Sequence, residues 1–287
     1  MDSTSEPALL APPMSHFEVD AQNARSRRYS LAFRDIAEGA RLWRLGFTLG
    51  WLDIKLKYRG SMLGPFWLTL STAIMIGAMG TLYSVLFHMD VHAYLPFLAT
   101  SLVMWNAIGG LVGEACTTFT MSEGTIRAMR MPFFVHVVRV VVRTVIQLAH
   151  NLPVIIGVFW FFHSWPGLVA WRAIPGLGLW TLDAVAACFF LGALCARFRD
   201  VPPIVGSIMQ IAFYITPVIW RPEQLGRKGR FLPLNPFDSL LEIVRAPLLG
   251  HHAGWQCYAF AIGYSLLFML ITTALFARVR SRLAFWL

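Results

Sequence analysis

Long apolar stretches alternate with charged segments along this chain of 287 residues. An α-helix rises about 1.5 Å per residue and needs about 20 apolar residues to cross the hydrocarbon layer of a bilayer. Six stretches meet this length with almost no charge: residues 65–87, 93–113, 144–162, 173–196, 201–220 and 253–277. The pattern predicts an all-α, polytopic membrane protein in which residues 61–287 form six transmembrane helices.

The basic residues fall unequally on the two sides of such a membrane. With the amino terminus in the cytosol, eighteen Lys and Arg residues lie on the cytosolic side. The other side holds six: Arg172, Arg221, Arg227, Lys228, Arg230 and Arg245. Because cytosolic loops are the ones enriched in Lys and Arg, we expect both termini in the cytosol.

Composition supports the membrane class and narrows the partners. Hydrophobic residues make up 57% of the chain and charged residues only 14%, too few charges for the surface of a soluble protein of this length. The net charge of +9 gathers beside the membrane boundaries, so anionic lipid headgroups or an anionic substrate are better partners than nucleic acid. Neither the four cysteines nor the eight histidines show a metal-binding spacing.

The charged segment ahead of the first span is expected to lie on the membrane. Residues 31–60 place Trp43, Phe47 and Trp51 between basic side chains, a composition typical of an amphipathic helix in the headgroup layer. A cytosolic helix docked on a protein is the alternative. Residues 1–30 are expected to form a disordered cytosolic tail.

Two cytosolic connections are candidate contacts for a partner protein. The first, residues 116–136, contains Ser122, Glu123, Arg127 and Arg130 and is typical of a short polar helix between two spans. The second is the turn at residues 197–200. A solvated connection without a partner is the alternative for the first.

The outer segment, residues 221–254, is expected to contain short helices that cannot cross the membrane. Asn235 can cap a helix that begins at Pro236, and Pro247 should stop this helix. Arg245 would lie near its carboxyl end, where the helix dipole favours a positive charge. About eleven residues are too few to span, so the helix should lie at the outer boundary as a lid over an exit.

Polar side chains also occur inside the predicted spans. Ser207, Gln210 and Tyr214 in the fifth span are spaced three and four residues apart, which places them on one helix face. Such a face borders either a hydrated path or a neighbouring helix. Asp183 in the fourth span is either a proton relay or part of a hydrogen-bonded pair with a basic or amide group.

Several short sequence runs, taken together, resemble those of a known protein family. In chain order they are KYRGSMLGPFW at 57–67, HNLP at 150–153, ARFRD at 196–200, ITPVIW at 215–220, NP at 235–236 and VRAPLLG at 244–250. From about residue 31 to the carboxyl end, the chain resembles the membrane subunit of bacterial ABC-type polysaccharide exporters. The O-antigen exporter branch is the nearest match, with capsule and teichoic acid permeases as relatives.

This resemblance implies a homodimer in the bacterial inner (cytoplasmic) membrane, driven by two copies of a separate cytosolic ABC ATPase. The substrate would be a polysaccharide such as O-antigen, linked to polyprenyl pyrophosphate and exported for lipopolysaccharide biosynthesis. ATP and Mg would bind to the ATPase, and no cofactor is expected in this chain, which has no GxxxxGK[ST] run. The chain would then be a non-catalytic transport subunit.

The resemblance also implies roles for individual residues. The substrate pathway would follow the first and fifth spans, along Trp67, Tyr83, Ser84, Phe87, Ser207, Gln210 and Tyr214. The diphosphate headgroup would meet Lys55, Lys57 and Arg59. Coupling to the ATPase would use Ser122, Glu123, Arg127, Arg130, Arg197 and Asp200. The outer gate would include Asn235, Pro236 and Arg245.

Three alternatives stay open from the sequence. A capsular polysaccharide or teichoic acid export permease has the same architecture. A membrane-embedded glycan transferase needs a general base or metal-binding carboxylates at the boundary, for which only scattered residues are on offer: Asp53, Asp90, Glu114, Asp200 and Asp238. An ion-coupled transporter would have Asp183 alone as its membrane acid.

Overall fold

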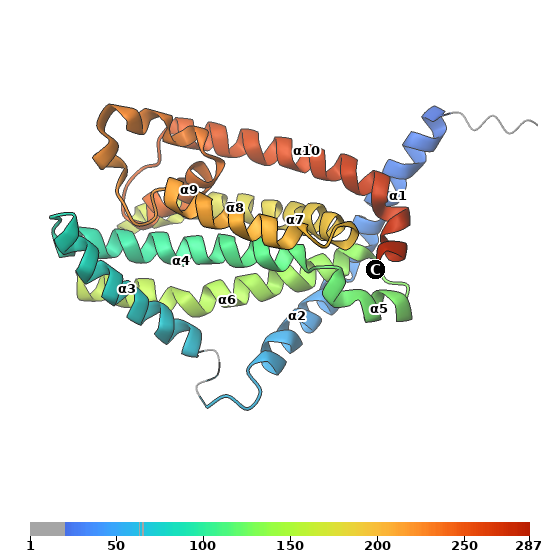
Figure 1. Ribbon diagram of the computed structural model, residues 1–287, viewed down its shortest axis with the longest axis horizontal. Helices are drawn as coiled ribbons and strands as arrows, with labels where there is room; N and C mark the ends of the chain where they lie inside the picture. Colours follow the sequence, from blue (N-terminus) through green and yellow to red (C-terminus); the bar gives the residue numbers. More distant parts are fainter. Residues whose placement is uncertain (1–20, 63, 65) are drawn as a thin grey trace, which may run out of the picture.

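The computed structural model describes residues 21–62, 64 and 66–287, and within this part of the chain it contains helices and turns but no strand (Figure 1). The all-α prediction is therefore confirmed. The α-helices are α1 (Ala21–Arg41), α2 (Trp43–Lys57), α3 (Phe66–Leu86), α4 (Val91–Cys116), α5 (Glu123–Ala128), α6 (Phe133–Phe161), α7 (Ala173–Arg197), α8 (Val201–Ile215), α9 (Pro236–Leu248) and α10 (Trp255–Trp286). Short 3₁₀ segments cover Thr120–Ser122, Gly167–Arg172 and Pro222–Leu234.

Five of the described helical segments are long and apolar enough to cross a membrane: Phe66–Leu86, Val91–Cys116, Phe133–Phe161, Gly167–Arg197 and Trp255–Trp286. The sixth predicted span is shorter than expected, because α8 has only 15 residues. Its end has a local cause. Thr216 takes an extended conformation, as expected for a residue that precedes a proline, and Pro217 follows it. A sixth crossing therefore has to combine α8 with the irregular residues 216–220.

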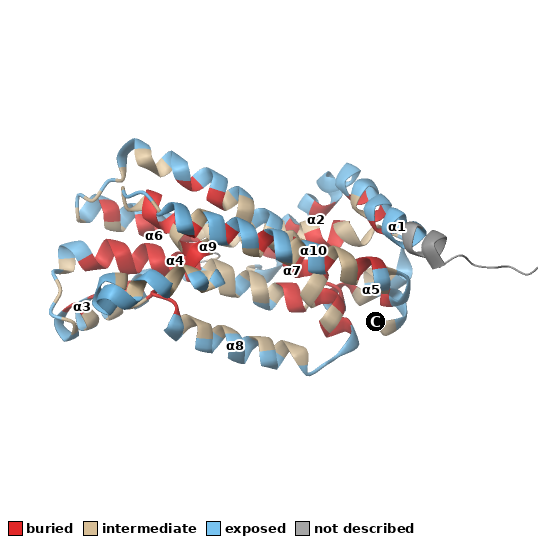
Figure 2. Cartoon of the chain, turned by 90° about the horizontal axis from the view of Figure 1, so that it is seen from above, coloured by how far each residue is buried: buried red, intermediate tan, exposed pale blue. Residues whose placement is uncertain are grey.

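Helix α4 forms the centre of the bundle. Every residue from Tyr94 to Trp105 is buried, because α3, α6, α7, α8 and α9 all pack around it. Pro96 lies in the second turn of α4, where the helix tolerates it close to its start. By contrast, α8 contains no buried residue, and Figure 2 shows it set apart along one edge of the molecule.

The segment expected to be one interfacial helix is two helices. Helix α1 begins at Ala21, inside the stretch expected to be a tail, and α2 follows after a break at Leu42. Residues 1–20 lie outside the described part of the chain, as do Leu63 and Pro65.

Helix α2 packs closely on α6 through glycines. A Cβ atom on Gly46 would lie 2.7 Å from a methyl carbon of Val138, and one on Gly50 would lie 2.7 Å from the carbonyl oxygen of Arg139. The aromatic side chains Trp43, Phe47 and Trp51 are exposed. The helix is therefore amphipathic in an unusual way, with a small-residue face on the protein and a face of aromatic and basic side chains turned outward.

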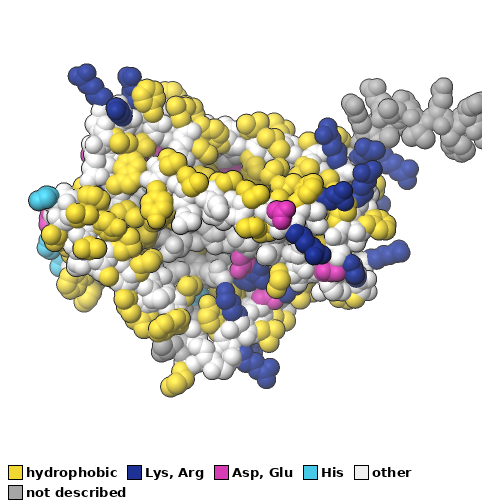
Figure 3. Space-filling model, in the orientation of Figure 1, with side chains coloured by type: hydrophobic (Ala, Val, Ile, Leu, Met, Phe, Trp, Pro, Cys, Tyr) yellow, Lys and Arg dark blue, Asp and Glu magenta, His cyan; other side chains and the backbone are white. Residues whose placement is uncertain are grey.

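The surface agrees with a membrane protein whose ends differ in charge. In Figure 3, Lys and Arg side chains gather at the end that carries α1, α2 and α5, and apolar side chains cover much of the surface between the two ends. The carboxyl terminus lies at the same basic end (Figure 1). Because cytosolic segments are the ones enriched in Lys and Arg, this end is the one expected to face the cytosol.

Candidate functional site

An ion-pair network joins α2, α4 and α6 near the basic end. Arg139 Nε and Nη2 donate to the two carboxylate oxygens of Asp53, both at 2.6 Å. Arg143 Nη1 donates to Asp53 at 3.0 Å, and the same arginine forms an ion pair with Glu114 of α4. Both carboxylates are thus neutralised by guanidinium groups, so neither has the chemistry of an available general base.

A second ion pair fastens α1 to the bundle. The carboxylate of Asp35, almost fully buried, accepts hydrogen bonds from Arg280 Nη2 at 3.0 Å and from the backbone N–H of Phe134 at 3.2 Å. Burial raises the pKa of Asp35 and Arg280 opposes that rise. Helix α1 is therefore held by α10 and by the first turn of α6.

The first predicted coupling segment is a short polar helix, as expected. Helix α5 carries an exposed ion pair between Glu123 and Arg127 at 2.9 Å, and Arg130 is exposed just beyond its end. Ser122 is buried instead, in the 3₁₀ turn that leads into α5. The preceding Phe119 is fully buried, and a Cβ on Gly192 of α7 would lie 2.9 Å from its ring. The segment is therefore anchored to α7 at its base while α5 stands out.

The second coupling candidate, the turn at residues 197–200, lies at the same end of the molecule as α5. The guanidinium of Arg197 lies 5.3 Å from the ring centre of Trp286, near the carboxyl terminus. Asp200 is exposed and precedes the first residue of α8. A contact at this turn would act directly on α8.

The polar face predicted on α8 points away from its own bundle. Ser207, Gln210 and Tyr214 are all exposed, with Tyr214 at 64%. Ser207 only donates to the carbonyl of Pro203 within its own helix, at 3.1 Å. Met209, on the opposite side of α8, lines an internal cavity instead. In a single protomer, this polar strip is thus left without a protein neighbour.

The pathway residues predicted on α3 divide into two groups. Trp67 is 57% exposed, and Tyr83 stacks on Phe87 with ring centres 5.5 Å apart. Ser84 is buried and donates to the carbonyl of Thr81, so it faces the protein interior. Helices α3 and α8 both lie along the lower edge of the molecule in Figure 2. Within one protomer the described residues of this set enclose no path.

The three cations proposed for the headgroup are exposed. Lys55 and Lys57 lie in the last turn of α2, and Arg59 follows in the turn before Gly60, which has a positive φ of 84°. None of the three takes part in an ion pair within the described residues. Their charges are therefore available to a ligand or to lipid headgroups.

The outer gate candidates form a connected structure around α9. Asn235 caps the helix as predicted, with its carbonyl oxygen accepting from the N–H of Phe237 at 3.0 Å. Its side-chain amide also donates to the hydroxyl of Thr216 at 2.9 Å, which links α9 to the chain just beyond α8. The expected stop at Pro247 is wrong by one residue, because this proline is accommodated in the last turn and α9 ends at Leu248.

Arg245 has a larger role than the sequence suggested. Its side chain is 2% exposed and donates to Ser101 of α4 at 3.2 Å, to Glu242 at 2.9 Å and to the carbonyl of Pro217. The guanidinium also lies 4.7 Å from the ring centre of Phe97. A lone arginine in the apolar run VRAPLL was the available signal for such a buried hub.

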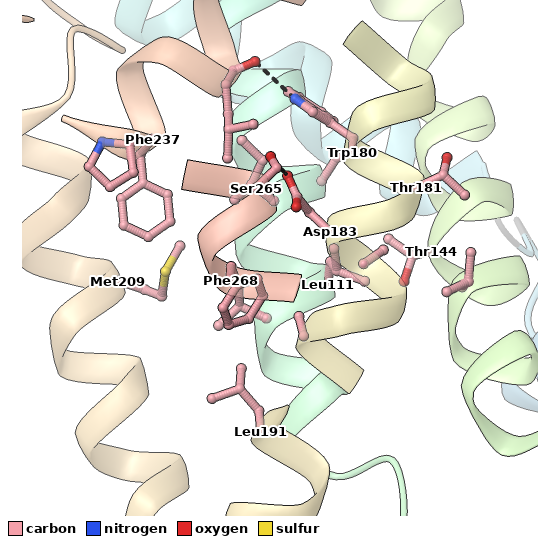
Figure 4. A pocket seen from close by; sticks show the side chains of 18 of the residues that line it. Leu111, Thr144, Trp180, Thr181, Asp183, Leu191, Met209, Phe237, Ser265 and Phe268 are labelled. Carbon is pink, nitrogen blue, oxygen red and sulfur yellow. Dashed lines mark hydrogen bonds between the residues drawn. The ribbon is translucent and has the colours of Figure 1, made fainter. Parts of the chain in front are cut away.

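A cavity of about 570 Å³ separates α8 from α4, α6, α7, α9 and α10. Its wall is almost entirely apolar, with Asp183 as an exception (Figure 4). The carboxylate of Asp183 accepts a hydrogen bond from the hydroxyl of Ser265 at 2.7 Å. Of the two alternatives left open for Asp183, the pair with a basic or amide group is not found among the described residues, because the partner is a hydroxyl. Nearby, Trp180 donates to the carbonyl of Leu240 at 2.9 Å, which ties α7 to α9.

These features define a multi-pass, all-α membrane protein with the polar helix α5 projecting at one end and the capped helix α9 near the other (Figure 1). The chain belongs to the ABC-2 type transporter family, whose model matches residues 44–249. Membership makes it the membrane part of an ABC transporter that works with an ATPase partner.

Two curated relatives are similar to the chain in sequence along most of their length. The chain is 24% identical over 205 residues to the O-antigen export system permease protein RfbA of Myxococcus xanthus, an alignment that covers 69% of this chain and 78% of that protein. It is 19% identical over 237 residues to the protein of the same name from Klebsiella pneumoniae, covering 81% and 90%.

Proposed function

We propose that this chain is the transmembrane subunit of an ATP-driven exporter that moves O-antigen across the inner membrane. The substrate would be the polysaccharide linked to polyprenyl pyrophosphate, carried from the cytosol to the outer face. The observation that carries this proposal is the family match over residues 44–249 together with two relatives named as O-antigen export permeases. The transport subunit itself is non-catalytic.

The exposed polar strip of α8 supports a homodimer with the conduit between its protomers. Ser207, Gln210 and Tyr214 would be unfavourable against lipid, since polar groups in the hydrocarbon layer need partners or water. On α3, Trp67 is exposed and Tyr83 is partly exposed, and this helix lies along the same edge (Figure 2). Two such edges facing each other would enclose a hydrated path with aromatic surfaces, on which sugar rings can stack weakly. Weak contacts suit a conduit, because a tightly held polymer would stall.

Helix α5 is the proposed contact for each of two ATPase copies. It stands out from the basic end with its Glu123–Arg127 pair exposed, while Phe119 anchors its base on α7. A push on α5 would therefore reach α7 through the turn at its base, and α4 and α6 through the chain on either side. The Asp53–Arg139–Arg143–Glu114 network makes α2 follow the same movement.

The proposed arrangement also places the lipid-linked end of the substrate. Helix α2 would lie in the cytosolic headgroup layer, with Trp43 and Trp51 towards membrane lipid. Lys55, Lys57 and Arg59 would then meet the diphosphate as it enters. Cations at this level favour a doubly charged headgroup, and both termini would be cytosolic.

The test is export in cells that lack the gene and carry variants of it. Replacing both Glu123 and Arg127 with alanine should trap lipid-linked glycan in the cytosol and abolish surface O-antigen. The matched control is Arg230→Ala, an exposed arginine of the outer 3₁₀ segment, which should leave export unchanged. Normal surface glycan in a deletion strain without a paralogue contradicts the proposal. Accumulation of capsule precursor instead of O-antigen precursor would reassign the substrate.

A further inference from the structure

A second cavity, of about 270 Å³, lies at the end of the molecule opposite α5. It is bounded by the first turns of α4, the turn after α6, the start of the 3₁₀ segment Pro222–Leu234, and α9. Unlike the cavity behind α8, its wall mixes charged, hydroxyl and aromatic groups. It has no part in the pathway, coupling or headgroup sites described above.

Donor and acceptor groups with unused hydrogen-bonding capacity line this cavity. Arg221 and Glu223 line it and neither forms an ion pair among the described residues. Arg221 uses Nη2 to donate to the carbonyl of Ala93 at 3.1 Å, which leaves its other N–H groups available. The hydroxyl oxygen of Ser164 is buried and has no partner. A buried hydroxyl without a partner is unfavourable, so this position favours a bound hydroxyl group.

The wall beneath these groups is rigid. Arg245 is almost fully buried and lines the cavity while it holds Glu242 by two N–H groups. Glu242 accepts both bonds through one oxygen, so its second carboxylate oxygen accepts no bond from Arg245. The guanidinium groups of Arg245 and Arg221 lie 4.7 Å and 5.4 Å from the ring centre of Phe97.

The charged side chains that line the cavity indicate which kind of ligand it can bind. Two arginines are matched by two glutamates, so a phosphate or a uronate would approach carboxylates as well as cations. A neutral polyhydroxylated ring fits better, because its hydroxyls donate to Glu223 and Glu242 and accept from Arg221. Hydrogen bonds in which one partner is charged are about twice as strong as neutral ones. The volume is slightly below the range of about 300–1,000 Å³ of drug-sized pockets, which suits one or two sugar rings.

We propose that this cavity is a subsite for a neutral sugar unit at the outer end of the permease. The inference rests on the proposed export function, which supplies glycan to this side of the membrane. Arg221 and Ser164 donate and accept hydrogen bonds with the sugar hydroxyls, and Arg245 positions the wall without being the recognition group.

Saturation-transfer NMR on the full chain in lipid nanodiscs tests the proposal. The probes are the methyl glycosides of glucose, galactose, mannose, rhamnose and N-acetylglucosamine, with methyl glucuronide and inorganic phosphate as anionic comparators. We expect transfer to at least one neutral glycoside, reduced at least fivefold in Arg221→Met and in Ser164→Val. Arg227→Met is the matched control, because Arg227 is exposed on the same segment and does not line the cavity.

Three results overturn the subsite. They are no transfer to any neutral glycoside, equal transfer in the two cavity variants and the wild type, or tighter binding of phosphate or glucuronide. Thermal unfolding of each variant shows whether it is folded, and Ser164→Val provides a second variant if Arg221→Met unfolds. A wild-type chain that exports glycan but shows no transfer removes only the subsite. A chain that binds sugar but does not export removes only the proposed function.

Discussion

Arg139 of α6 holds Asp53 of α2 through two parallel hydrogen bonds of 2.6 Å each, although the two residues are 86 positions apart in the chain. This bidentate geometry is the strongest form of arginine–carboxylate pairing. It fastens a surface helix to a membrane-spanning one. A movement of α6 would therefore carry α2 with it.

Replacing Asp53 with Asn should destabilise the protein, because Arg139 would remain largely buried without its counter-charge. Breaking such a pair costs about 3 kcal/mol or more. The measurement is the thermal unfolding midpoint of the purified chain in detergent. Arg41→Gln, which removes an exposed charge from α1, should change stability by less than about 0.5 kcal/mol. Equal shifts in the two variants would show that the pair contributes nothing.

Two glycine-to-alanine substitutions should have opposite effects on stability. Gly50→Ala would place a Cβ 2.7 Å from the carbonyl oxygen of Arg139, and backbone cannot move aside cheaply, so overpacking should cost about 1–3 kcal/mol. Gly157→Ala in α6 meets no atom within 4 Å and should stabilise its helix by about 0.5–1 kcal/mol. Chemical denaturation of both variants in the same detergent measures the difference. A stable Gly50→Ala protein would mean that α2 does not pack on α6 at this distance.

Arg245→Lys should not be tolerated as a conservative change. A lysine ammonium cannot reproduce the fork that reaches Glu242, Ser101 and the carbonyl of Pro217 together. We expect a loss of about 2 kcal/mol or more, since each hydrogen bond to a charged group contributes about 1.5–3 kcal/mol. The control is Arg230→Lys, whose guanidinium is exposed over Phe231. Wild-type unfolding behaviour of Arg245→Lys would remove Arg245 as the connector of α9 to α4.

The reactivity of introduced cysteines tests whether the polar strip of α8 contacts water. The four native cysteines are buried and can be replaced to give a background without thiols. In that background, Ser207→Cys and Gln210→Cys in membranes should react with a charged methanethiosulfonate reagent. Met209→Cys, on the cavity side of the same helix, should react at least tenfold more slowly. Unreactive thiols at both 207 and 210 would place the strip against lipid and contradict the conduit.

Asp183→Asn should retain ATP-driven export, because the amide oxygen of Asn can still accept the hydrogen bond from Ser265. Ser265→Ala should be the more damaging change, since it leaves the carboxylate without a donor in an apolar wall and costs about 1–3 kcal/mol. Export rates and thermal unfolding of the two variants separate transport from stability. Loss of export in a folded Asp183→Asn protein would favour an ion-coupled mechanism.

Much of the architecture follows from properties that are local in the chain. The spans were predictable because apolar length largely decides whether a helix can cross a bilayer, and five of the described helical segments are long and apolar enough to do so. The cap at Asn235 was predictable because the side chain bonds to a backbone group only two residues away. The shortened α8 could have been anticipated from Pro217, which disfavours helical geometry at Thr216.

Contacts between distant parts of the chain came only with the folded molecule. The sequence marked Asp53 and Glu114 as scattered acids and Asp183 as a lone membrane acid. Their partners are Arg139, Arg143 and Ser265, brought close by helix packing. In the same way, no local pattern distinguishes a glycine that admits a neighbouring helix at Gly46 from one that faces open space at Gly157. Hydrophobic length and charge bias are set by residues adjacent in sequence, whereas ion-pair partners and close packing depend on which helices become neighbours.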